Sequence, residues 1–193
     1  MAQNAEYEFR PEVLVLAHCL LNYGTRWWQY EPSNENRGPC PEIVRFLVKH
    51  RVGAIQLPCP EYSFCGNPRP PRTKDEYERT PSFSSHCKDL AVGTARYLKA
   101  MARAKDGSEL KILAIVGVEH SPTCAVKSTP RIINGLKVYV EEKGLFMDLL
   151  EKELIALGLN FPFIDVNLND RKEIGRRLNF LLRKPKKHPG CSP

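Results

Sequence analysis

The chain has 193 residues, of which 42% are hydrophobic and 26% charged, proportions that are ordinary for a globular protein and argue against disorder. It has no stretch of roughly 20 apolar residues, as a membrane span needs, and no apolar run near its start that would indicate a secretory signal, so we expect a cytoplasmic protein without a membrane partner. The net charge of +7 lies mostly in residues 170–193, so the rest of the chain lacks a basic surface for nucleic acid, which makes such a partner unlikely.

Four short runs rich in Val, Ile and Leu, without polar alternation, predict strands that are buried on both faces. They are residues 13–17, 53–57, 111–118 and 161–166. Helical patterns lie between them at 41–49, 84–103 and 141–157. Strand–helix–strand order repeated three times predicts an α/β fold of three layers, a mostly parallel, Rossmann-like sheet with helices on both faces.

Two segments, 23–39 and 62–81, lack apolar periodicity and are predicted to be loops with a function, because long loops in a compact domain are commonly functional. We expect one catalytic domain over residues 1–169 and a basic C-terminal tail over 170–193. Within the tail, 174–182 is a short amphipathic piece, and the residues after it should be frayed. A monomer and a homodimer both fit this organisation.

Three of the seven cysteines each follow a predicted strand, Cys19 in HCLLN, Cys59 in PCPE and Cys124 in EHSPTC. Ligands of open parallel sheets bind beyond the carboxyl ends of the strands, so we expect these three thiols to converge in one crevice. Taken singly, each cysteine is equally well explained as a small buried hydrophobe. Thiolates select soft or borderline metals, chiefly zinc, copper(I) and iron–sulfur clusters. The absence of a C-x-x-C pair argues against a zinc ribbon or a thioredoxin motif.

These motifs resemble those of the thiouracil desulfurase family, especially its desulfidase relatives, over about residues 13–169. The resemblance rests on HCLLN, QLPCPE and SPTC, and extends to Arg69, Arg72, Tyr77 and Cys87. It implies an enzyme with a [4Fe-4S] cluster held by Cys19, Cys59 and Cys124, whose fourth iron takes sulfur from a small thiolated substrate. This substrate would be a thiouracil-like heterocycle or another small sulfur compound. Water would replace the sulfur in a non-redox step, and sulfide would leave.

The sequence departs from the family pattern at two positions. Ala125 follows Cys124 where the family has glycine, so the turn there must take another shape. Cys40 is an additional thiol that would block catalysis if it bound the open iron, although an exposed cysteine at a helix start is the simpler interpretation. We interpret Cys65, Cys87 and Cys191 as non-ligands.

Replacing sulfur by oxygen needs a group that accepts and donates protons, and Glu61, two residues after Cys59, is our candidate; it could instead cap local backbone amides. Ser121 is predicted to orient substrate or water, or else to form a turn before Pro122. Four further residues are candidates for contacts with the substrate: His18, Asn22, Arg69 and His120. Satisfied core histidines, a local turn at Asn22 and a solvated Arg69 are the alternatives.

Two other functions fit the same cysteines. A non-catalytic iron–sulfur protein would act as a redox sensor, or would bind nucleic acid through the basic tail. A zinc hydrolase would use the three thiolates and an open coordination position.

Overall fold

The computed structural model describes residues 10–28, 38–103 and 109–182, and its centre is a parallel β-sheet. The four strands lie in the order β2-β1-β3-β6 and have the bounds β1 Glu12–Leu16, β2 Gly53–Gln56, β3 Lys111–Val118 and β6 Phe163–Val166. Neighbouring strands are parallel at every pairing. The four predicted strands and the three-layer α/β fold are thus confirmed.

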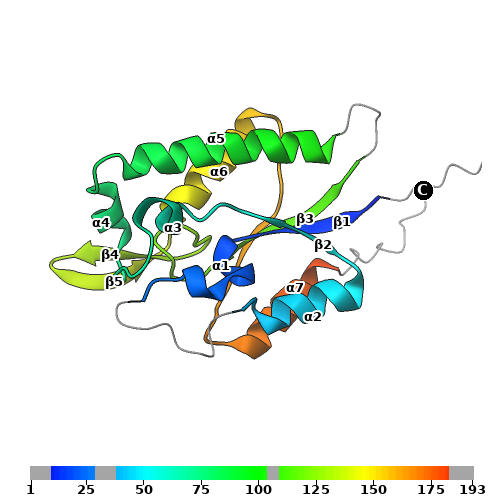
Figure 1. Ribbon diagram of the computed structural model, residues 1–193, viewed down its shortest axis with the longest axis horizontal. Helices are drawn as coiled ribbons and strands as arrows, with labels where there is room; N and C mark the ends of the chain where they lie inside the picture. Colours follow the sequence, from blue (N-terminus) through cyan, green and yellow to red (C-terminus); the bar gives the residue numbers. More distant parts are fainter. Residues whose placement is uncertain (1–9, 29–37, 104–108, 183–193) are drawn as a thin grey trace, which may run out of the picture.

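Helices cover both faces of the sheet (Figure 1). Helices α5 (Phe83–Ala102) and α6 (Leu145–Ala156) pack along each other on one side, and α2 (Pro41–His50) packs against α7 (Arg171–Leu181) on the other. The three predicted helices are confirmed, but α6 begins at Leu145 rather than at 141. Residues 141–144 are not helical, and the amide of Gly144 donates to Ala125 O at 2.9 Å in the loop after β3.

The hydrophobic core follows from the strand order. The two inner strands, β1 and β3, have a strand on each side and helices on each face, so their apolar runs are almost wholly buried. Strand β2 lies at an edge, and most of its residues are exposed. Because the strands are parallel, their carboxyl ends lie at the same edge of the sheet, where α1 (His18–Leu21) and α3 (Pro60–Cys65) begin (Figure 1).

Part of the predicted basic tail belongs to the body of the protein. Asp170 caps α7 by accepting from Glu173 N at 3.0 Å, and Ile174 and Leu178 of this helix, 1% and 0% exposed, lie in the hydrophobic core. The described structure therefore continues the domain through α7, past the predicted boundary at 169. Residues 183–193 lie outside the described residues.

The segment 62–81, predicted as a loop, contains the greater part of α3 and all of α4 (Lys74–Glu78). Helix α4 begins with a capping box, in which Thr73 Oγ1 accepts from Glu76 N and the Glu76 carboxylate accepts from Thr73 N. Within 23–39 the structure has a 3-10 turn, η1 (Tyr23–Thr25), and residues 29–37 lie outside the described residues.

An antiparallel hairpin of β4 (Thr129–Ile133) and β5 (Leu136–Val140) was not predicted from the sequence. Its two-residue turn is Asn134-Gly135, both with positive φ, as a type I′ turn requires. Arg131 ties the hairpin to α4 through ion pairs with Asp75 and Glu78. No helix among the described residues is long and apolar enough to cross a bilayer.

Candidate functional site

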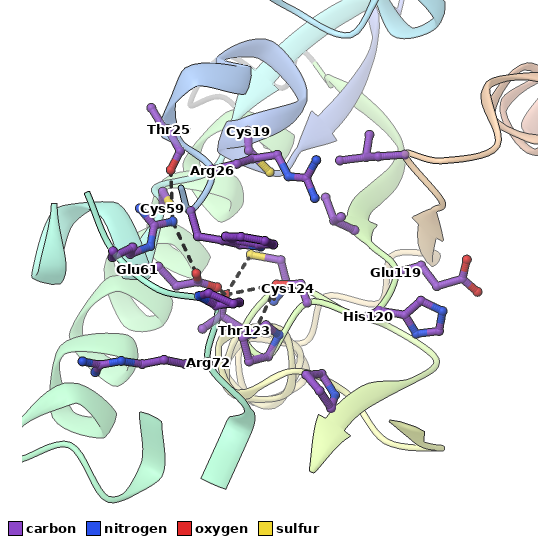
Figure 2. Close-up of a pocket in the computed structure, with 18 of the residues that line it drawn as sticks. Cys19, Thr25, Arg26, Cys59, Glu61, Arg72, Glu119, His120, Thr123 and Cys124 are labelled. Atoms are coloured by element: carbon purple, nitrogen blue, oxygen red, sulfur yellow. Dashed lines mark hydrogen bonds and ion pairs between the residues drawn. The ribbon is translucent and has the colours of Figure 1, made fainter. Parts of the chain in front are cut away.

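The three cysteines that follow strands line one cavity of about 240 Å³. Cys19 lies in α1 directly after β1, Cys59 is the N-cap of α3 after β2, and Cys124 lies in the loop 119–128 between β3 and β4, here called the Cys124 loop. Figure 2 shows the three thiols reaching this cavity from three separate segments. The expected convergence is therefore observed, and it follows from the alignment of the strand ends.

The other described cysteines do not line this cavity. Cys40 is buried before α2, and its thiol donates to Glu42 Oε2 at 3.4 Å, so the expectation of an exposed cysteine at that helix start is wrong. Cys65 ends α3, and Cys87 is buried in α5. Cys191 lies outside the described residues.

All three thiols of the cavity have a raised pKa. Removal from solvent, followed by the neighbouring Cys59, raises the pKa of Cys19 to about 12. Removal from solvent and the nearby Glu61 raise the pKa of Cys59 to about 11. Burial raises the pKa of Cys124 most, with Cys59 and Cys19 adding to the effect. Without a cation in the cavity these groups are protonated thiols at neutral pH, and a bound metal would have to displace their protons.

The arrangement of the thiols bears on the kind of metal centre that they can hold. A single zinc ion requires its thiolates within about 2.3 Å of one point, and no group of three or more His, Cys, Asp or Glu side chains in the described ranges meets such a requirement. A cluster distributes its ligands over several iron atoms, so its cysteines lie around it. Three thiols around one cavity are compatible with this second arrangement.

The Cys124 loop is held by short-range hydrogen bonds and two glycines. Ser121 Oγ accepts from Cys124 N at 3.0 Å and from Thr123 N at 3.3 Å, while Cys124 O accepts from Val118 N at 3.0 Å. A Cβ on Gly117 would lie 2.1 Å from Cys124 O, and one on Gly144 would lie 2.4 Å from the carbonyl carbon of Thr123. The loop can lie this close to β3 and α6 only because both positions are glycine.

Ala125 shows how the turn forms without the glycine of the family pattern. Among the described non-glycine residues, positive φ occurs in the Cys124 loop only at His120, with φ 63°. Ala125 is fully buried, its amide donates to Ser121 O, and its carbonyl accepts from Gly144 N. The residue with left-handed backbone in this loop is therefore His120, which precedes Cys124, and not Ala125, which follows it.

Glu61 is buried between the second and third cysteine motifs, 8% exposed, and its carboxylate has three partners. Oε1 accepts from Thr123 Oγ1 at 2.7 Å. Oε2 accepts from Tyr77 OH at 3.2 Å and from the Arg69 guanidinium at 3.3 Å. Because an ionised carboxylate has about four acceptor positions, these contacts leave about one for water or substrate. The alternative of Glu61 as a cap for local amides does not describe these contacts.

Arg69 lines the cavity but is committed to the protein. It is buried, and the four hydrogens of its terminal nitrogens go to Gly66 O, Asn67 Oδ1, Thr25 O and Glu61 Oε2. Its Nε is buried without a partner in the described part of the chain. The structure therefore contradicts a solvated Arg69, and it places the side chain as a support for Glu61 rather than as a free group for the substrate.

The remaining predicted residues divide into two groups. His120 and Ser121 line the cavity, and the His120 ring packs on Tyr139 with centroids 4.1 Å apart. His18 and Asn22 do not line it. Gln56 bridges these two, accepting from Asn22 Nδ2 at 2.6 Å and contacting His18 Nδ1 at 2.7 Å. Their prediction as substrate contacts is not supported by this placement.

Several cavity residues were missed. Thr123 joins Glu61 to the third motif, and its hydroxyl lies 3.5 Å from the Cys124 sulfur. The hairpin contributes Lys137 and Tyr139 to the wall, and its Asn134-Gly135 turn was the signal that would have revealed it. Trp27 also lines the cavity and is 47% exposed.

Comparisons with known proteins gave two similarities. No protein-family model matches the chain. The chain is 27% identical over 159 residues to the Uncharacterized protein MJ0003 of Methanocaldococcus jannaschii, covering 82% of this chain and 88% of that protein. The solved structure of the [4Fe-4S]-dependent thiouracil desulfidase TudS aligns with 88% of this chain and 99% of that one, with a TM-score of 0.47 and 18% identity. At these levels the site has to be interpreted from its own residues.

Proposed function

We propose that this chain is an iron–sulfur-dependent desulfidase that replaces the sulfur of a small thiolated compound, such as a thiouracil-like heterocycle, by oxygen and releases sulfide. The observation that carries the proposal is the cavity lined by Cys19, Cys59 and Cys124 together with the buried Glu61. Thiolates are the ligands that iron–sulfur clusters take. The resemblance of the three cysteine motifs to thiouracil desulfurases agrees with this donor set.

In this proposal Cys19, Cys59 and Cys124 hold a [4Fe-4S] cluster. When bound, a cluster with three protein ligands supplies an iron that can act as a Lewis acid toward sulfur. The protein contributes the cavity, in which the backbone amide of Tyr62 already donates to Cys59 Sγ at 3.4 Å. Ser121 accepts from the Cys124 amide and is a residue of the cavity wall.

Glu61 is the proposed general acid and base. One oxygen, Oε1, accepts a single hydrogen bond, from Thr123, so its second acceptor position can take a proton from water. Tyr77 and Arg69 hold the other oxygen and keep the carboxylate in one orientation. Loss of the carboxylate should therefore slow turnover without removing the metal.

Anaerobic purification followed by iron and sulfide analysis tests the metal centre, and we expect about four of each per chain. Cys59→Ala should lose most of the iron, whereas Cys40→Ala, a buried cysteine outside the cavity, should keep it. A sulfide-release screen against thiolated bases then tests the reaction. Glu61→Gln should retain iron and slow release by roughly a hundredfold or more. A Glu61→Gln protein with full turnover would remove Glu61 from the proposal.

The same preparation separates the proposal from a nucleic-acid-binding iron–sulfur protein. Because α7 lies in the core, the truncation that tests the basic tail is deletion of residues 183–193, not of 170–193. If this deletion leaves sulfide release intact, the tail is dispensable for the reaction. Salt-dependent binding of RNA, lost on deletion and unaccompanied by sulfide release, would favour the alternative.

A further inference from the structure

The structure assigns Asp165 and Arg177 as positioning residues that hold the Cys124 loop in the conformation that presents its thiol to the cavity. Neither residue is near the cysteine motifs in sequence: Asp165 is in β6 and Arg177 is in α7. The inference rests on the proposed function in treating Cys124 as a ligand, but the contacts that carry it do not involve a metal.

Asp165 holds the exit of the loop. Its side chain is fully buried, 0% exposed, and Oδ2 accepts from Val126 N at 3.0 Å and from Lys127 N at 2.9 Å. These two amides follow Cys124 by two and three residues. Hydrogen bonds to an ionised acceptor are about twice as strong as neutral ones, so the carboxylate determines where this part of the loop lies.

Arg177 holds the carboxylate and also contacts the entrance of the loop. Its guanidinium donates to Asp165 Oδ1 at 3.0 Å and to Asp165 O at 2.6 Å. The same group lies 3.8 Å from a carboxylate oxygen of Glu119, the first residue of the Cys124 loop and a residue of the cavity wall. Glu173 Oε1 accepts from Arg177 Nη2 at 2.7 Å and from Arg177 Nε at 2.9 Å. One side chain of α7 thus contacts the entrance of the loop directly and its exit through Asp165.

The two other cysteines of the cavity are positioned differently. Cys19 and Cys59 lie at the start of helices that follow β1 and β2 after short connections. Cys124 lies in an irregular segment before a hairpin, where β3 and the start of α6 hold the backbone up to Ala125, and the next two amides are bonded to Asp165. The buried Asp165 carboxylate, paired with the partly buried Arg177, adds a constraint at the exit of the loop, and this explains a buried carboxylate outside the cavity's chemistry.

Thiol labelling in the metal-free native protein tests the assignment. Asp165→Leu removes the acceptor, Asp165→Asn keeps an oxygen for the amides but not for Arg177, and Arg177→Met removes the guanidinium. Asn179→Ala, an exposed position on the same helix, is the matched control. The rate of alkylation is measured separately at Cys124 and at Cys87, which is buried in α5 and reports on global opening.

We expect alkylation of Cys124 to be roughly tenfold faster or more in Asp165→Leu than in the wild type, because strong charge-assisted hydrogen bonds are lost. The rate should also rise in Asp165→Asn and Arg177→Met, but by a smaller factor. Cys87 should keep its wild-type rate in the two milder variants, and Asn179→Ala should change neither. Equal acceleration at both cysteines, or an unchanged Cys124 rate in every variant, would overturn the assignment. If Asp165→Leu does not fold, the two milder variants decide. A wild-type chain that binds no iron would refute the proposed function and leave this test intact.

Discussion

Gly117→Ala is the substitution whose effect the structure defines most sharply. The new Cβ would lie 2.1 Å from Cys124 O and 3.2 Å from a methyl group of Val126, whereas ordinary contacts begin at 3.4 Å. The carbonyl belongs to the backbone and must therefore withdraw by more than an ångström, which breaks its hydrogen bond from Val118 N. Overpacking of this kind costs about 1–3 kcal/mol. We expect a folded protein of lower stability in which the third thiol is displaced from the cavity.

The assay measures iron per chain after anaerobic purification together with the free energy of unfolding from urea titration. Gly117→Ala should lose iron beyond what its lower stability explains. Gly93→Ala is the matched control, because its Cβ meets no heavy atom within 4 Å and the residue is exposed in the interior of α5. This control should gain about 0.5–1 kcal/mol and keep its iron. Wild-type iron content and stability in Gly117→Ala would refute the argument that close approach at this glycine positions Cys124.

Three further outcomes follow from the site. Arg69→Met should lower the free energy of unfolding by about 3 kcal/mol, because it leaves Glu61 buried without its ion-pair partner. Arg72→Met, at a less buried position of the same cavity, should lower the free energy of unfolding much less in the same denaturation assay. The metal-free protein should lose stability as pH rises from 9.0 towards about 12. The reason is that the raised thiol pKa values make the folded state bind more protons than the unfolded state in this window. A melting temperature that stays constant across this range would contradict the claim that burial raises these pKa values. Thr123→Val should retain iron but reduce sulfide release, measured by sulfide quantification, because Glu61 loses its donor at Oε1; an equally active variant would show that this hydrogen bond is dispensable.

The sheet and the place of the site could be predicted because both depend on local sequence patterns. Uninterrupted apolar runs identify strands that are covered on both faces, and a cysteine directly after such a run must lie near the carboxyl edge of the sheet. The convergence of Cys19, Cys59 and Cys124 needed no knowledge of strand order, since parallel strands place all their carboxyl ends at one edge.

The contacts within the site could not be predicted in the same way, because they depend on side chains from distant segments. Arg69 lies in a stretch of polar residues and prolines that indicates a solvated loop, yet its side chain is buried against Thr25 O and Glu61. His18 adjoins a ligand motif, but its ring turns toward Gln56 on the neighbouring strand. Helix α7 was assigned to a tail because its charge suggested solvent exposure, although Ile174 and Leu178, four residues apart, indicated a buried face.

The order in which the chain is synthesised gives the ion pair of Asp165 and Arg177 a consequence for biogenesis. All three cysteines leave the ribosome before these two residues do, so a nascent chain carries its thiols before the loop that presents the last of them can be held. For the proposed cluster, insertion would then follow completion of the fold, and the interval before it is when the thiols would be open to oxidation. Chains truncated before residue 165 should consequently fail to take up iron, even though every cysteine of the cavity is present.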